Sequence, residues 1–152
     1  MSFMLRSFLI GLVAGQRGVT PLAVAAGAAR RGTLPAQAPG AGLLAHPVVA
    51  SGAVALAAAE MAGDKMATAP DRTILPGLIA RAMSAGFAGA ALAERRRGTG
   101  ALVAATTAVA AAYAGLAVRR YGMRRWGQTA TGFVEDAAVL AGGIAIARLP
   151  AR

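Results

Sequence analysis

Apolar runs separated by short polar segments dominate the chain. Prolines and charged turns, such as residues 94–98, interrupt the apolar pattern between the runs. A helix needs about 20 residues to cross the hydrocarbon core of a bilayer. Four runs approach or reach this length: residues 43–62, 78–93, 101–118 and 127–146. The pattern predicts an all-α, polytopic transmembrane helical bundle of four to five spans, built as a single integral-membrane domain over residues 1–152.

The first apolar segment is interrupted. Residues 3–14 and 22–29 are each too short to cross a bilayer alone. Proline suits the first turn of a helix and threonine suits its N-cap, so the second half has its own start signal. The residues that break the helix are Gly15, Gly18, Thr20 and Pro21. We therefore expect a broken or re-entrant N-terminal helix, and the partial positive charge at the start of its second half favours an anion there.

Composition and charge support a membrane location. Hydrophobic residues make up 57% of the chain and charged residues 14%, with a net charge of +10. A basic chain raises nucleic acid as a partner. Here the arginines form short clusters beside apolar runs, and aromatic residues amount to only 5%, so stacking platforms for single strands are lacking. Arginines in these positions suit lipid headgroups. We expect the lipid bilayer as the partner and no nucleic acid.

The distribution of basic residues does not fix the orientation. With five spans, seven basic residues fall on each side, and a re-entrant first segment changes the split only to eight against six. The positive-inside rule then gives no preference. Either the assumed spans or the intramembrane arginines distort the count, or the protein inserts in both orientations and pairs as an antiparallel homodimer.

Charged residues inside the apolar segments are the main candidates for function. A charge at mid-depth costs about 2.5–3.5 kcal/mol on insertion scales, so such residues are expected to face inward and to pair. Pro70 and Pro76 fold one helix back beside its neighbour, which favours a pair between Arg81 and either Glu60 or Asp64. The expected intramembrane polar network consists of Arg17, Glu60, Asp64, Lys65, Arg72, Arg81, Glu135 and Asp136.

The chain carries no pattern typical of an enzyme or of a metal site. Cysteine is absent and His46 is the single histidine, which excludes thiolate and multi-histidine sites. Glu135 and Asp136 are adjacent in sequence, which does not suit ligation from one helix face. We expect no enzymatic activity, no metal and no cofactor.

Small residues recur every four positions in three of the predicted helices. This spacing lets helix backbones approach closely in lipid. It predicts a tightly packed bundle without a wide pore. The three sets are Ser51, Ala55 and Ala59; Ala82, Gly86 and Ala90; and Ala104, Ala108 and Ala112.

Several blocks of residues resemble a known family. One block is the segment Gly15-Gln16-Arg17-Gly18-Val19-Thr20-Pro21, and another combines Glu60, Asp64, Lys65, Pro70, Arg72 and Thr73. Further blocks are Arg81 with residues 84–86 and 89–90, and the pair Glu135-Asp136. In these blocks the chain is similar to the bacterial integral-membrane domain-of-unknown-function family 4126. Met66 and Ala67 stand where that family commonly has a proline. The resemblance implies a helical membrane fold and no established activity.

Two functions are compatible with these features. The first is an ion or small-solute transporter or channel, in which carboxylates at a helix break bind a cation or a proton. The second is a structural or assembly factor of the membrane, in which the buried charges only fix helix packing. In both cases we expect a multi-pass protein of the bacterial inner membrane.

Overall fold

The computed structural model describes residues 3–35, 37–65 and 73–150, and every regular element in these ranges is an α-helix. The seven helices are α1 (Phe3–Gln16), α2 (Thr20–Arg30), α3 (Ala41–Ala45), α4 (Pro47–Gly63), α5 (Leu75–Leu92), α6 (Arg97–Trp126) and α7 (Gln128–Arg148). The all-helical prediction is thus confirmed for the described part of the chain. Three helices, α5, α6 and α7, are long and apolar enough to cross a membrane, whereas α1 and α4 are shorter apolar helices.

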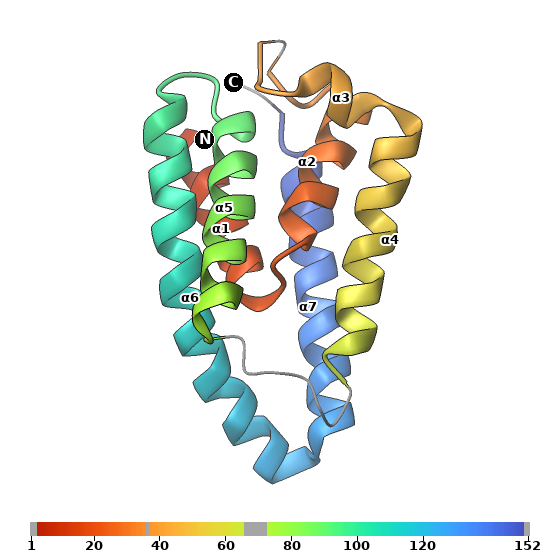
Figure 1. Cartoon of the computed structure of the whole chain (residues 1–152), viewed down its shortest axis with the longest axis vertical. Helices are drawn as coiled ribbons and strands as arrows, with labels where there is room; N and C mark the ends of the chain where they lie inside the picture. Colours follow the sequence, from red (N-terminus) through yellow and green to blue (C-terminus); the bar gives the residue numbers. More distant parts are fainter. Residues whose placement is uncertain (1–2, 36, 66–72, 151–152) are drawn as a thin grey trace.

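The helices run along the long axis of the molecule (Figure 1). From one end, α1 descends to the middle, the chain reverses after Gln16, and α2 returns to the same end. There Arg6 donates to the carbonyl of Thr33, and the Thr33 hydroxyl donates to the carbonyl of Ala147 near the end of α7. We call this the terminal end, because α1 begins and α7 finishes there. At the opposite end α6 and α7 meet at Gly127, which we call the elbow.

The helices form two groups (Figure 1). In the tight group, α1, α5 and α6 pack closely against one another; in the second group, α2 lies between α4 and α7. Close approach in the tight group depends on glycine. A Cβ at Gly15 would lie 2.4 Å from Cβ of Ala111, and one at Gly89 would lie 2.5 Å from Cβ of Ala104. Such contacts make α1, α5 and α6 a closely packed unit.

The predictions for the small-residue sets have mixed outcomes. Ala104, Ala108 and Ala112 are all fully buried in α6, as expected. On α5, Ala82, Gly86 and Ala90 are only partly buried. The buried residues of that helix are Ala85, Ala88, Gly89, Ala91 and Leu92. The prediction for α4 is wrong, because Ser51, Ala55 and Ala59 are exposed. That helix packs mainly on α2, and Ala50, Ala57 and Met61 are its buried positions.

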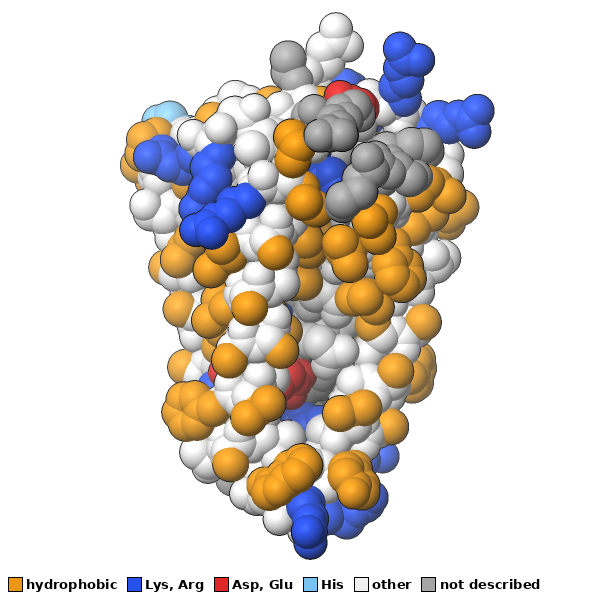
Figure 2. Space-filling model, turned by 180° about the vertical axis from the view of Figure 1, so that it is seen from behind, with side chains coloured by type: hydrophobic (Ala, Val, Ile, Leu, Met, Phe, Trp, Pro, Cys, Tyr) orange, Lys and Arg blue, Asp and Glu red, His pale blue; other side chains and the backbone are white. Residues whose placement is uncertain are grey.

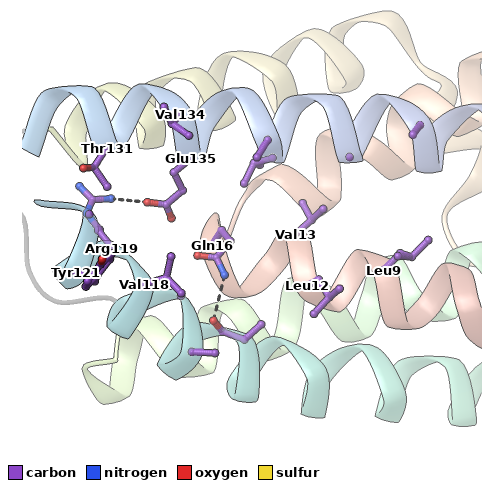
Figure 3. A pocket seen from close by; sticks show the side chains of 18 of the residues that line it. Leu9, Leu12, Val13, Gln16, Val118, Arg119, Tyr121, Thr131, Val134 and Glu135 are labelled. Carbon is purple, nitrogen blue, oxygen red and sulfur yellow. Dashed lines mark hydrogen bonds and ion pairs between the residues drawn. The ribbon is translucent and has the colours of Figure 1, made fainter. Parts of the chain in front are cut away.

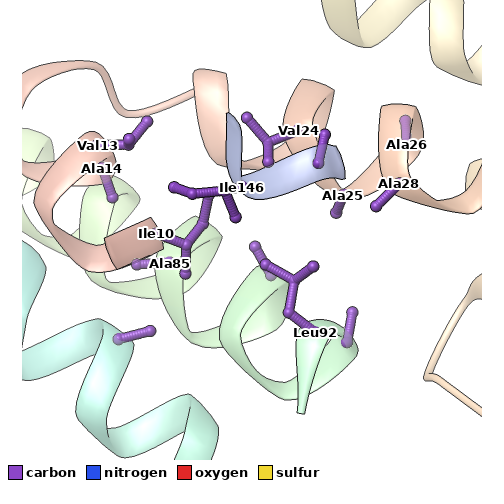
Figure 4. Packing of buried hydrophobic residues seen from close by; sticks show 14 of the residues in the cluster. Ile10, Val13, Ala14, Val24, Ala25, Ala26, Ala28, Ala85, Leu92 and Ile146 are labelled. Carbon is purple, nitrogen blue, oxygen red and sulfur yellow. The ribbon is translucent and has the colours of Figure 1, made fainter. Parts of the chain in front are cut away.

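The hydrophobic core joins the two groups near the terminal end (Figure 4). Ile10 of α1, Leu92 of α5 and Ile146 of α7 converge there with Val24 of α2. Ile10 and Leu92 are almost completely buried. The small side chains around them leave little space between helices, so these few large residues fix how the helices meet.

Two helix boundaries differ from the sequence prediction. The apolar run of residues 101–118 was expected to be one helix, but α6 continues beyond it to Trp126. Residues 43–62 were expected to form one helix, but His46 has an extended backbone and separates α3 from α4. Pro47 then opens α4, a position where its missing N–H costs nothing.

The surface is apolar between two basic ends (Figure 2). Exposed large side chains such as Val48, Met83, Leu102 and Val134 lie along the helices. Basic side chains gather at the terminal end, and a smaller set lies at the elbow. The terminal end carries Arg30, Arg31, Arg95, Arg96, Arg97 and Arg148, and the elbow carries Arg120, Arg124 and Arg125. Such a surface suits a membrane-embedded helical protein.

Candidate functional site

The break between α1 and α2 is set by Pro21. A continuous helix would need an N–H from Pro21 to reach the carbonyl of Arg17, and proline has none. Pro21 instead occupies the first turn of α2, as predicted, and α2 begins at Thr20. The predicted N-cap role of Thr20 is wrong: Val19 is the N-cap residue and no side chain of that residue caps the helix. The Thr20 hydroxyl is buried without a hydrogen-bond partner among the described residues.

The start of α2 binds an anion that the chain itself supplies. The N–H groups of Gly18 and Val19 donate to the two carboxylate oxygens of Glu60, at 2.7 and 2.9 Å. A carboxylate at a helix N-terminus is stabilised by the free N–H groups and by the helix dipole. Arg81 lies 3.9 Å from Glu60, so the predicted partner of this arginine is found. The Ser84 hydroxyl donates to the carbonyl of Gly18 and holds the break against α5.

Arg17 is the centre of the remaining network and is only 1% exposed. Its Nε and Nη2 donate to Oδ1 of Asp136, at 2.9 and 2.6 Å. Its Nη1 lies 2.8 Å from Oδ2 of Asp64 and 3.7 Å from Oε1 of Glu135. Nη1 also donates to the carbonyl of Gln16 at 3.2 Å. One guanidinium therefore joins the end of α1 to both α4 and α7.

Two further cations complete this network. Nη1 of Arg119 pairs with Asp64 and, at 3.1 Å, with Oε2 of Glu135. Nη2 of Arg119 donates to the backbone carbonyl of Asp64, which closes the end of α4. The ammonium of Lys65 pairs with Asp136 and lies 4.9 Å from the centre of the Phe133 ring. Asp136 thus accepts from two cations.

The charges are segregated between the two helix groups. The three arginines come from the tight group, where Arg17 follows α1, Arg81 lies on α5 and Arg119 lies on α6. The four carboxylates, Glu60, Asp64, Glu135 and Asp136, come from α4 and α7 of the second group. Among the described residues, each of these arginine–carboxylate pairs therefore crosses between the groups. With Lys65, four cations face four anions, and within the described residues the network is neutral.

The structure brings together seven of the eight residues predicted for the network: Arg17, Glu60, Asp64, Lys65, Arg81, Glu135 and Asp136. Arg72, the eighth, and Pro70 lie outside the described residues. Arg119 was missed because the helix was expected to end before it. The spacing of Arg119 could have identified it from the sequence. Arg119 follows Ala112 by seven residues, which is two helical turns, and so continues the buried side of α6.

An open groove reaches the network between α1, α6 and α7 (Figure 3). Its volume is about 1260 Å³. Most of its lining is apolar, including Leu12, Val118 and Val134. The Arg119–Glu135 ion pair forms part of its wall on the elbow side. Further along the groove, the Gln16 amide donates to the carbonyl of Ala111 at 3.1 Å. The groove therefore lies along the same boundary between the groups that the ion pairs cross.

The carboxylates of the network are all engaged by cations or backbone N–H groups. Among the described residues no cluster of three histidine, cysteine or acidic side chains could hold a metal ion. The ion pairs of this network can exchange partners. When a carboxylate gains a proton or binds a cation, its ion pair with an arginine of the other group becomes weaker.

Comparisons with family models, with curated proteins and with solved structures found no match. The resemblance to the integral-membrane family therefore stays a prediction. The fold and the surface define an all-helical protein with three helices able to cross a membrane.

Proposed function

We propose that the protein crosses the membrane four times, with α4, α5, α6 and α7 as spans and α1–α2 as a re-entrant hairpin. Supporting this, α1 and α2 both have their outer ends at the terminal end (Figure 1). At about 1.5 Å per residue, α4 measures roughly 26 Å and needs only slight thinning of a bilayer core of about 30 Å. The membrane is the inner membrane of a bacterium.

We infer that the terminal end faces the cytoplasm. Lys65 and Arg119 belong to the network and do not count as loop charges. Without them, and with the buried Arg6 also left out, six basic residues at the terminal end stand against three at the elbow within the described ranges. The positive-inside rule then favours one orientation. Counting Lys65 and Arg119 as loop charges would bring the elbow to five and nearly restore the balance, so dual insertion loses most of its motivation.

We propose that the protein is an ion or small-solute transporter or channel whose centre is the network at the helix break. One observation carries the proposal: all arginine–carboxylate pairs of the network lie between two helix groups, with the arginines on one and the carboxylates on the other. Alternating access commonly moves one bundle against another around such a site. An interface made of exchangeable ion pairs can part and close again, whereas the glycine-mediated packing inside the tight group cannot.

The coupling species in this proposal is a proton or a cation. The side chains of the carboxylates are 10–23% exposed, whereas that of Arg17 is 1% exposed. An incoming proton or cation therefore meets the acidic side of the interface first. Neutralising Glu60 weakens its pair with Arg81 and its hold on the start of α2, which links occupancy to the position of the re-entrant hairpin.

A structural role is the second candidate, and the neutrality of the network favours it. Four cations and four anions balance without any bound ion among the described residues. Removing one partner of a buried ion pair typically costs 3–5 kcal/mol, because an uncompensated charge stays behind. In a membrane protein that only needs fixed helix packing, the ion pairs of the network would hold the two helix groups in one arrangement.

Charge-neutral substitutions separate the two functions. Glu60→Gln and Asp136→Asn are reconstituted in proteoliposomes, and the fluxes of H⁺, Na⁺, K⁺ and Cl⁻ are measured under imposed gradients. The transport proposal expects folded variants that lose flux. Glu94→Gln is the matched control, since Glu94 is an exposed acid in the α5–α6 turn.

Unfolding of a single variant would by itself favour the structural role. The double variant Glu60→Gln with Arg81→Gln therefore completes the test, because it removes the pair without leaving an unpaired charge. A stable double variant without flux supports transport. A parent protein that carries none of these ions, together with single variants that unfold and a double variant that recovers stability, supports the structural role.

A further inference from the structure

The groove between α1, α6 and α7 carries an inference that goes beyond the proposed function. We propose that it binds an anionic phospholipid, with an acyl tail in the groove and the phosphate at the elbow. Neither transport nor exchange of ion pairs is needed for this binding.

The dimensions of the groove suit a lipid tail. Its lining on α7 extends from Ala130 to Leu149, roughly 29 Å at about 1.5 Å per residue. A tail occupies one leaflet, which is half of a hydrocarbon core of about 30 Å. A tail that starts at the elbow therefore ends near Ala138 and Val139, well inside the groove. Small residues such as Ala138 and Gly142 line its floor.

The chemistry of the lining favours an apolar occupant over water. Few side chains of the lining are strongly polar, and those in the middle and on the elbow side of the groove have interaction partners. Gln16 donates to a backbone carbonyl, Arg119 pairs with Glu135, and the Thr131 hydroxyl donates to the carbonyl of Gly127. Around them the lining is apolar along the length assigned to the tail, with Val118, Ala130, Val134 and Ala138 among its residues.

The elbow supplies the features that recognise a headgroup. Tyr121 and Trp126 line the groove there, are more than 60% exposed and contact each other edge to face. Amphipathic aromatic residues of this kind sit at the level of the headgroups. Arg125 follows Tyr121 by four residues and Gly122 by three, so it lies on the groove side of α6. An arginine beside interfacial aromatics attracts an anionic lipid.

Charge favours a phospholipid over a second copy of the chain. Arg124 and Arg125 form no ion pair with any described residue. Another copy would bring a net charge of +10 to them, and four of its six acids are engaged in its own network. A phosphate diester supplies the missing negative charge, and its tail fills the groove.

Fluorescence of Trp126 tests the proposal directly, because it is the only tryptophan of the chain. The parent is reconstituted with brominated phosphatidylglycerol or brominated phosphatidylcholine, whose bromines quench a neighbouring indole. We expect quenching at a lower mole fraction of the anionic lipid. Arg125→Gln should reduce this preference about fivefold, the value expected for one basic residue near the surface. Arg148→Gln, at the terminal end, should leave it unchanged.

A second pair of variants tests the groove itself. Ala138→Phe fills it, whereas Ala137→Phe alters the adjacent exposed alanine, which does not line it. Only the first should weaken quenching by the anionic lipid. Equal quenching by both lipids, or equal effects of both alanine variants, would overturn the proposal. Loss of a crosslinked dimer in Ala138→Phe alone, with unchanged lipid preference, would assign the groove to a second copy. Glu60→Gln should keep the lipid preference even where flux is lost, which separates this inference from the proposed function.

Discussion

Arg17 and Asp136 stand 119 residues apart in the chain and meet at 2.6 Å, where Nη2 of the arginine donates to Oδ1 of the aspartate. This contact ties the break after α1 to the third turn of α7. The Arg17 side chain is 1% exposed, so water has almost no access to this contact in this arrangement of the helices. The pair is therefore the deepest point of the interface between the two helix groups.

Substitution of Arg17 tests how much stability this contact supplies. Arg17→Gln should lower the free energy of unfolding by about 3–5 kcal/mol, because it leaves three carboxylates facing two cations in this part of the network. The double variant with Asp136→Asn should recover part of the loss, since it restores the balance of charge. Unfolding in detergent, followed by circular dichroism, measures both. Additive losses in the two single variants and the double variant would show that the residues do not interact.

Close packing of α1 on α6 gives a second prediction. A Cβ at Gly15 would lie 2.4 Å from Cβ of Ala111 and 2.8 Å from its backbone, so Gly15→Ala forces the helices apart. Overpacking of this kind typically costs about 1–3 kcal/mol. Gly52→Ala is the matched control, because Gly52 lies in α4 with open space around it. The control should be neutral or stabilising by up to about 1 kcal/mol. Thermal unfolding of both variants, measured against the parent, gives the two changes in stability.

The members of the network were largely predictable, and their partners were largely not. Charges within apolar runs must pair in hydrocarbon, which identified residues such as Arg17 and Asp136 from the sequence alone. The pair of Arg81 with Glu60 followed from chain reversal between neighbouring helices. The pair of Arg17 with Asp136 depends on how α1 and α7 pack, which no local pattern records. Small-residue spacing on α4 was misleading for the same reason, because spacing alone does not tell which side of a helix is covered.

The start of α2 offers a third prediction, at the level of single amides. Glu60 accepts from the N–H groups of Gly18 and Val19, and it is the one side chain seen to do so. Glu60→Gln keeps one acceptor oxygen but loses the charge that the helix dipole favours. We expect faster hydrogen exchange at residues 18–19, measured by mass spectrometry, with unchanged exchange in α6. Ser84→Ala, which removes the hydroxyl's bonds to the carbonyls of Gly18 and Arg81, should have a smaller effect. Unchanged exchange in Glu60→Gln would show that the carboxylate does not hold the break.

The orientation of the chain can be tested with single cysteines, since the sequence contains none. Thr99→Cys lies at the terminal end and Gln128→Cys at the elbow, and both positions are exposed. The excess of arginine at the terminal end predicts that it faces the cytoplasm. A membrane-impermeant maleimide should therefore label Gln128→Cys in cells with a permeabilised outer membrane and should reach Thr99→Cys only after the inner membrane is opened. Labelling of both positions before that step would revive dual insertion and the antiparallel homodimer. Labelling of Thr99→Cys alone would invert the orientation. In that case Arg119 and Lys65, on the elbow side, would lie nearer the cytoplasm, and the network would open first to that side.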